Sequence, residues 1–95
     1  MSVSLTLNPV LDLRAAAPLR AALLERRGEA MDIDASSVER LGGLCLQVLL
    51  SARRAWAEDG LPFSISSHSD SFAESMRLFG ASGRLGETLE AGGAF

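Results

Sequence analysis

The residues of this chain that are able to carry out chemistry are few and scattered. They comprise one histidine (His68), one cysteine (Cys45), two nearby carboxylates (Asp32 and Asp34) and a run of serines between Ser64 and Ser71. A histidine beside a nucleophile would support group transfer, and paired carboxylates would support general acid–base catalysis. His68 lies in a serine-rich turn, where a lone histidine is usually solvated. Cys45 falls on the apolar face of a helix, where a cysteine acts as a small hydrophobe. We therefore expect no enzymatic activity.

The same residues argue against a cofactor. One histidine and one cysteine cannot assemble a multi-ligand metal site, and the serine run lacks the glycine spacing of a phosphate-binding loop. Phosphate binding at the start of the helix that follows the serines is an alternative, but capping of that helix is the simpler role. Aspartates near the end of a strand, such as Asp32 and Asp34, usually cap or are solvated. The expected cofactor content is none.

The overall composition is that of one small folded domain. The chain has 95 residues, of which 47% are apolar and 22% charged, and its net charge is −3. A mildly acidic domain without a basic cluster is a poor candidate for binding nucleic acid. A single cysteine excludes an intrachain disulfide and favours a cytoplasmic location. No apolar run reaches the length of about 18 residues that a membrane span requires, and the first residues do not have the pattern of a secretory signal.

Hydrophobic periodicity gives the order of the elements. Alternation predicts strands, whereas apolar residues spaced by three and four predict helices. Strands are expected at 3–7, 10–13, 31–34 and 61–66, and helices at 15–27, 42–58 and 71–79. The last helix should begin with the capping box Ser71-x-x-Glu74 and point Phe72, Met76 and Phe79 inward. This order predicts an α/β domain over residues 1–81, with a mixed sheet of about four strands packed with three or so helices. Residues 82–95 are expected to form a loosely ordered tail.

The long helix is more apolar than one buried face requires. Leu44, Cys45, Val48 and Leu49 belong to a face that should pack on the sheet. Leu46 and Leu50 form a second apolar strip beside it. Either this strip meets a partner protein, or a neighbouring helix or the tail covers it, and in a small domain the second explanation is the more common.

The segment DIDASSVERLGGLCLQVLL resembles the centre of a STAS domain (sulphate transporter and anti-sigma-factor antagonist). In that family an apolar strand and a turn lead to Asp-Ser-Ser/Thr-Gly-Leu, which opens a helix and carries a phosphorylated serine. Alignment on the apolar residues places Gly42 on the aspartate and Gly43 on that serine. A register with Asp34 to Ser37 on the motif leaves too many residues before the helix-ending Gly60. The resemblance therefore implies a STAS-like fold without the usual phosphorylation switch.

The resemblance also implies a function by protein–protein binding. The expected docking residues are at the start of the long helix and in the loop before it, and they are Ser36, Ser37, Gly42, Gly43, Leu46, Gln47 and Leu50. The implied partner is a regulatory protein, such as an anti-sigma factor or a chemotaxis histidine kinase. The alternative partner is the ATPase of a lipid-trafficking ABC transporter, which some stand-alone STAS proteins bind. A small-molecule sensor is a third possibility.

Overall fold

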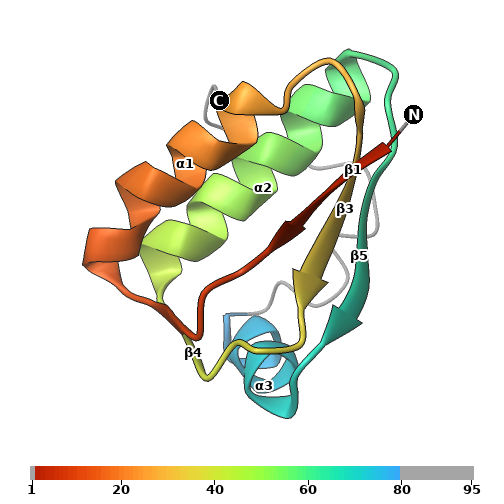
Figure 1. Ribbon diagram of the computed structural model, residues 1–95. Helices are drawn as coiled ribbons and strands as arrows, with labels where there is room; N and C mark the ends of the chain where they lie inside the picture. Colours follow the sequence, from red (N-terminus) through yellow and green to blue (C-terminus); the bar gives the residue numbers. More distant parts are fainter. Residues whose placement is uncertain (1, 80–95) are drawn as a thin grey trace.

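The α/β order expected from the sequence is present in the computed structural model, which describes residues 2–79 (Figure 1). The expected tail, residues 82–95, lies outside the described residues. The elements, in chain order, are β1 (Ser2–Thr6), β2 (Val10–Leu11), the 3-10 helix η1 (Leu13–Ala15), α1 (Ala16–Glu25), β3 (Ala30–Ala35), β4 (Arg40–Leu41), α2 (Gly43–Glu58), β5 (Phe63–His68) and α3 (Asp70–Leu78). The sequence analysis missed β4, because a strand of two residues has no period to detect, and it missed η1, whose first residue Leu13 was assigned to the expected strand 10–13.

The strands form two small sheets rather than one. The larger sheet has the order β1-β3-β5, and the smaller one pairs β2 with β4. Every described pairing is parallel, so the expected mixed sheet is wrong in this detail, although the α/β class is confirmed. Parallel neighbours need a crossover connection, and α1 and α2 supply the two crossovers of the larger sheet. Figure 1 shows these two helices side by side over one face of that sheet.

Alternation along β3 divides the larger sheet into an apolar face and a polar face. Met31, Ile33 and Ala35 are buried, whereas the intervening Asp32 and Asp34 are only half-buried. Successive strand residues point to opposite faces, so the helices cover the first set and the aspartates belong to the other face. β1 follows the same rule, because Val3 and Leu5 pack against the core while Ser4 and Thr6 are exposed.

The centre of the core is α2, and its burial corrects the sequence interpretation. Its buried residues are Cys45, Leu46, Leu49, Leu50, Ala52, Ala55 and Trp56. Leu46 is 3% exposed and Leu50 2%, so the second apolar strip is core and is not open for docking. The physical reason is that α2 has neighbours on several sides, since it packs against α1, β5 and η1. Leu44, expected to be buried, is instead 49% exposed.

The C-terminal end of α2 is fixed by backbone and side-chain contacts. Gly60 has a φ of +73°, which suits a residue without a side chain. Its N–H donates to the Ala57 carbonyl (3.0 Å), and the Leu61 N–H donates to the Trp56 carbonyl (2.9 Å). These two bonds are a Schellman motif, which satisfies carbonyls that the helix leaves unpaired. The expected stop at Asp59-Gly60 is therefore confirmed.

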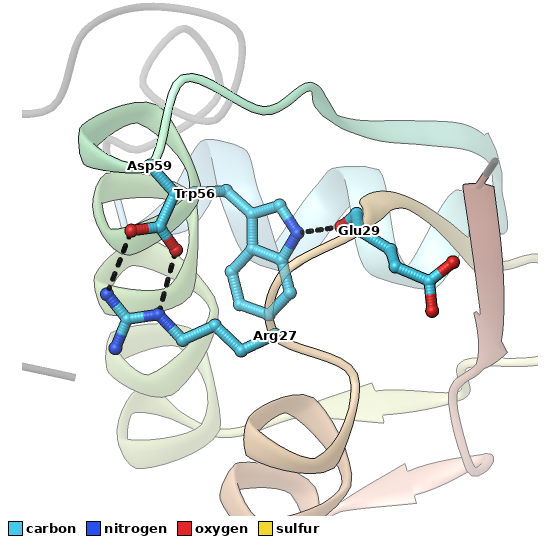
Figure 2. A network of polar contacts seen from close by, with 4 residues as sticks. All are labelled: Arg27, Glu29, Trp56 and Asp59. Carbon is cyan, nitrogen blue, oxygen red and sulfur yellow. Dashed lines mark hydrogen bonds and ion pairs between the residues drawn. The ribbon is translucent and has the colours of Figure 1, made fainter.

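Figure 2 shows how that end of α2 is tied to the segment between α1 and β3. The indole Nε1–H of Trp56 donates to the Glu29 carbonyl oxygen at 2.6 Å, just before β3. The Arg27 guanidinium pairs with the Asp59 carboxylate at 3.0 Å. The Trp56 ring also meets Phe63 of β5 edge to face, with 5.7 Å between ring centroids. Trp56 thus contacts β5 and the entry to β3 while being fully buried.

The start of α3 differs from the expected capping box. The cap is Ser69, whose Oγ accepts the Phe72 N–H at 3.0 Å. Ser69 is selected over Ser71 by long-range bonds, because its N–H donates to the Ala35 carbonyl (3.1 Å) and its hydroxyl donates to the Val38 carbonyl. Phe72 and Met76 are buried as expected, but Phe79 is 50% exposed.

Candidate functional site

The end of β3 is held by one carboxylate, that of Asp34. Its Oδ1 accepts the Ser36 N–H (2.9 Å), the Ser36 hydroxyl (2.6 Å) and the Ser67 hydroxyl of β5 (3.0 Å). These bonds, chiefly the one from the Ser36 hydroxyl, lower the pKa of Asp34 below its usual value because they favour the charged form. Asp34 therefore acts as a cap that positions the exposed Ser36-Ser37 turn, and it is not placed as a catalytic base.

The β2–β4 pair positions the start of α2. The Pro9 carbonyl accepts N–H groups from Glu39 and Arg40, at 2.7 and 3.1 Å. The Gly42 N–H then donates to the Leu11 carbonyl at 2.9 Å. A methyl group on Gly42 would lie only 3.2 Å from that carbonyl oxygen. Gly42 is thus the place where the chain passes close to β2.

Gly43, which the sequence resemblance aligns with the family serine, lies against the end of α3. A methyl group added to Gly43 would be 3.7 Å from the nearest atom of the Phe79 ring, which is ordinary van der Waals contact. Figure 1 shows the end of β3, β4, the start of α2 and α3 at the same end of the domain. Phe79 therefore shields one side of a helix start that has no side-chain cap.

The two adjacent glycines are expected to respond differently to the same substitution. Gly42→Ala should lower the free energy of unfolding by about 1–2 kcal/mol, because alanine is a poor N-cap and its methyl crowds the Leu11 carbonyl. Gly43→Ala should be neutral or raise the free energy of unfolding by up to about 1 kcal/mol, since alanine favours the helix. Urea unfolding monitored by circular dichroism measures both. Equal losses for the two variants would contradict this account of the helix start.

Large apolar side chains are exposed on the elements that meet at this helix start. Leu13 of η1 is 76% exposed, Leu44 of α2 is 49% and Phe79 after α3 is 50%. Cys45 fixes η1 against the helix, because its thiol donates to the Asp12 carbonyl at 3.3 Å. Gln47 is exposed one turn after Leu44. We call Leu13, Gly43, Leu44, Gln47 and Phe79 the α2-start surface.

The structure separates the predicted docking residues into two groups. Ser36, Ser37, Gly43 and Gln47 are exposed, and Gly42 is half-buried against β2. Leu46 and Leu50 belong to the core, so a partner protein cannot reach their side chains. Sequence reasoning missed Leu13, Leu44 and Phe79. None of the three carried a signal, because Leu13 fell within the expected strand 10–13, and Leu44 and Phe79 fell on helix faces that were expected to be buried.

The residues whose side chains could take part in chemistry do not gather at one site. Burial, with an addition from the nearby Asp12 charge, raises the pKa of the Cys45 thiol, which disfavours the reactive thiolate. His68 is exposed and stacks on Phe72 at 6.3 Å between ring centroids. Among residues 2–79, no three His, Cys, Asp or Glu side chains gather in a way that would hold a metal ion. In the same range, no helix combines the length and apolar character needed to cross a bilayer.

Comparison with known proteins agrees with this geometry. A search of curated proteins and a search of solved structures each returned no match. A family model described as "Mlab, STAS domain" matches residues 1–89. STAS domains are in general non-catalytic regulatory domains that bind partner proteins. The match covers most of the 95 residues, and the chain therefore belongs to the STAS family.

Proposed function

We propose that this protein is a non-enzymatic adaptor that regulates a partner protein by docking the α2-start surface onto it. The observation that carries the proposal is the exposure of Leu44 on the first turn of α2, directly after Gly43, against which the Phe79 ring lies. Leucine and phenylalanine side chains at roughly half exposure gain free energy when a partner covers them, at about 25 cal/mol per Å² of apolar surface. The exposed Ser36-Ser37 turn and Gln47 would supply polar contacts at the rim.

The glycine at position 43 determines how such an interface is controlled. A serine hydroxyl at this position would accept phosphate, and the added charge would repel an apolar partner surface. Gly43 has no group to modify, so docking through this surface is not switched by phosphorylation at that residue. The first partner class is a signalling protein, which is either an anti-sigma factor or a chemotaxis histidine kinase. The protein would then be an antagonist whose binding is not switched by phosphorylation at Gly43.

The second candidate partner is the ATPase of a lipid-trafficking ABC transporter. The absence of a hydroxyl at Gly43 favours this class, because a subunit of a permanent assembly needs an interface that stays available. An apolar interface without a charge switch is also typical of obligate complexes. In that case the protein would be an accessory subunit rather than a regulator of a signalling pathway.

Capture of partners from native lysate, with the full chain as bait and mass spectrometry as readout, separates these classes. The bait is compared with Leu44→Asp, which places a charge on the α2-start surface, and with Leu24→Asp, which makes the same change at an exposed leucine of α1. A signalling kinase or anti-sigma factor held by the wild type and Leu24→Asp, but lost with Leu44→Asp, supports the first class. An ABC ATPase with that pattern supports the second. A specific partner held equally by all three would show that docking uses another surface.

A further inference from the structure

Among residues 2–79, the outer edge of β1 has backbone groups that no strand pairs with. β1 is an end strand of the larger sheet and pairs only with β3 among the described elements. The Leu7 N–H donates to the Asp34 carbonyl of β3 at 2.9 Å. In a parallel ladder, alternate residues direct both backbone groups to the same neighbour, so Val3 and Leu5 also face β3. Ser4 and Thr6 therefore direct their N–H and C=O groups outward, where no described strand lies.

Within the described residues, β1 has none of the sequence features that commonly block pairing at an edge. Natural edge strands are commonly blocked by a charged side chain, a proline or a bulge. β1 reads SVSLT and contains neither a charge nor a proline. Its register with β3 is continuous from Ser2 to Thr6, whereas the bulge of this sheet lies between β3 and β5. The edge is thus a regular template for one more strand.

The packing of residues 2–79 also leaves a hollow beside this edge. A hollow of about 180 Å³ opens between β1, the segment after it and α1. Its apolar lining includes Leu5, Leu7, Leu11 and Leu19. Val3 and Leu5 remain partly exposed, although their neighbours in β3, Met31 and Ile33, are fully buried. An added strand would cover the helix-facing side of β1 and contribute apolar side chains toward the hollow.

We propose that the added strand is β1 of a second copy of this chain, paired antiparallel about a two-fold axis at Ser4. In this register Ser4 faces Ser4, and Val3 of each copy lies opposite Leu5 of the other on the apolar face. The outward N–H and C=O of Ser4 then form a hydrogen-bonded pair, which is the geometry that antiparallel strands require. The edge is uncharged, so the two copies do not repel each other. The three strands of each copy become one continuous sheet of six.

The test is the mass of the full chain in solution, measured by light scattering over a range of concentrations. The proposal expects a dimer of twice 10.0 kDa. Ser4 is exposed, so charged variants should fold, as circular dichroism will confirm. Ser4→Lys and Ser4→Glu should each weaken the dimer at least about fivefold, because like charges directly opposite each other are unfavourable. An equimolar mixture of the two should recover a mixed dimer. Ser64→Lys, on the exposed face of the other edge strand, should leave the dimer unchanged.

Several results would overturn the proposal. One is a wild-type protein that is monomeric at every concentration. Another is a Ser4→Lys variant that dimerises as tightly as the wild type. Failure of the lysine and glutamate variants to associate when mixed would also exclude the Ser4-centred register. Amide exchange supplies a second readout, since the Ser4 and Thr6 amides should be protected in the dimer and exchange rapidly on dilution. Protection of these amides in a monomer would mean that another segment of the chain covers this edge.

Discussion

Leu50→Asp is expected to unfold the protein, whereas Leu44→Asp on the same helix should leave the fold intact. Leu50 is 2% exposed, so the aspartate would place an unpaired charge in the core. Loss of the leucine and burial of the charge together cost at least about 3–5 kcal/mol. A small domain has only about 5–15 kcal/mol of stability in total, and this chain belongs near the lower end. The variant should therefore lose most of its cooperative unfolding transition.

Leu44→Asp is the matched control for this prediction. Leu44 is half-exposed in the first turn of α2, where the helix dipole favours a negative side chain by about 0.3–1 kcal/mol. The free energy of unfolding should thus change by less than about 1 kcal/mol. Circular dichroism during urea unfolding measures both variants. If Leu50→Asp remained folded with a stability close to that of the wild type, α2 would have to be rotated relative to its position in this structure.

Trp56→Ala is expected to produce the second large loss, about 3–5 kcal/mol. The indole is fully buried, packs edge to face on Phe63 and donates to the Glu29 carbonyl. Removing it leaves a cavity at the point where α2, β3 and β5 meet, and it leaves that carbonyl without its donor. Urea unfolding followed by far-ultraviolet circular dichroism is the appropriate measurement, because the chain has only one tryptophan to provide fluorescence.

Trp56→Phe separates the two contributions. Phenylalanine keeps much of the packing volume but cannot donate to Glu29, so its cost should be close to the about 1–3 kcal/mol of an unsatisfied buried acceptor. A loss as large as that of Trp56→Ala would assign the stabilisation mainly to the hydrogen bond. A negligible loss would show that water or another group satisfies the Glu29 carbonyl.

The regular elements could be predicted because their periods are local properties of the sequence. Alternation in β1 and β3 and the helical spacing of α2 gave bounds close to those observed, and Gly60 marked the helix end. The side of α2 that is exposed could not be predicted. Leu44, Leu46 and Leu50 have the same side chain, and only the positions of α1, β5 and η1 decide which of them is covered.

The candidate site could likewise be predicted only in part, because its contacts depend on how distant elements pack. The sequence alignment predicts that Gly43 takes the place of the family serine, but the contact of Gly43 with Phe79 depends on how α3 packs. Local chemistry favours Ser71 as the cap, because Glu74 would complete a capping box with it. The choice of Ser69 rests on bonds to Ala35 and Val38, more than thirty residues away, and no short-range pattern encodes those bonds.

Because Trp56 lies near the C-terminal end of α2, its fluorescence should report unfolding of the domain and not binding at the start of that helix. Leu44 lies at the opposite end of the helix, about 18 Å away at 1.5 Å per residue. The indole is shielded from solvent and bonded to Glu29, so its emission will shift when the domain unfolds. A ligand protein that contacts only the first turn of α2 leaves that environment unchanged. Titrations of a partner should therefore be silent in tryptophan emission from this chain, and a spectral shift during such a titration would signal unfolding or rearrangement of the core.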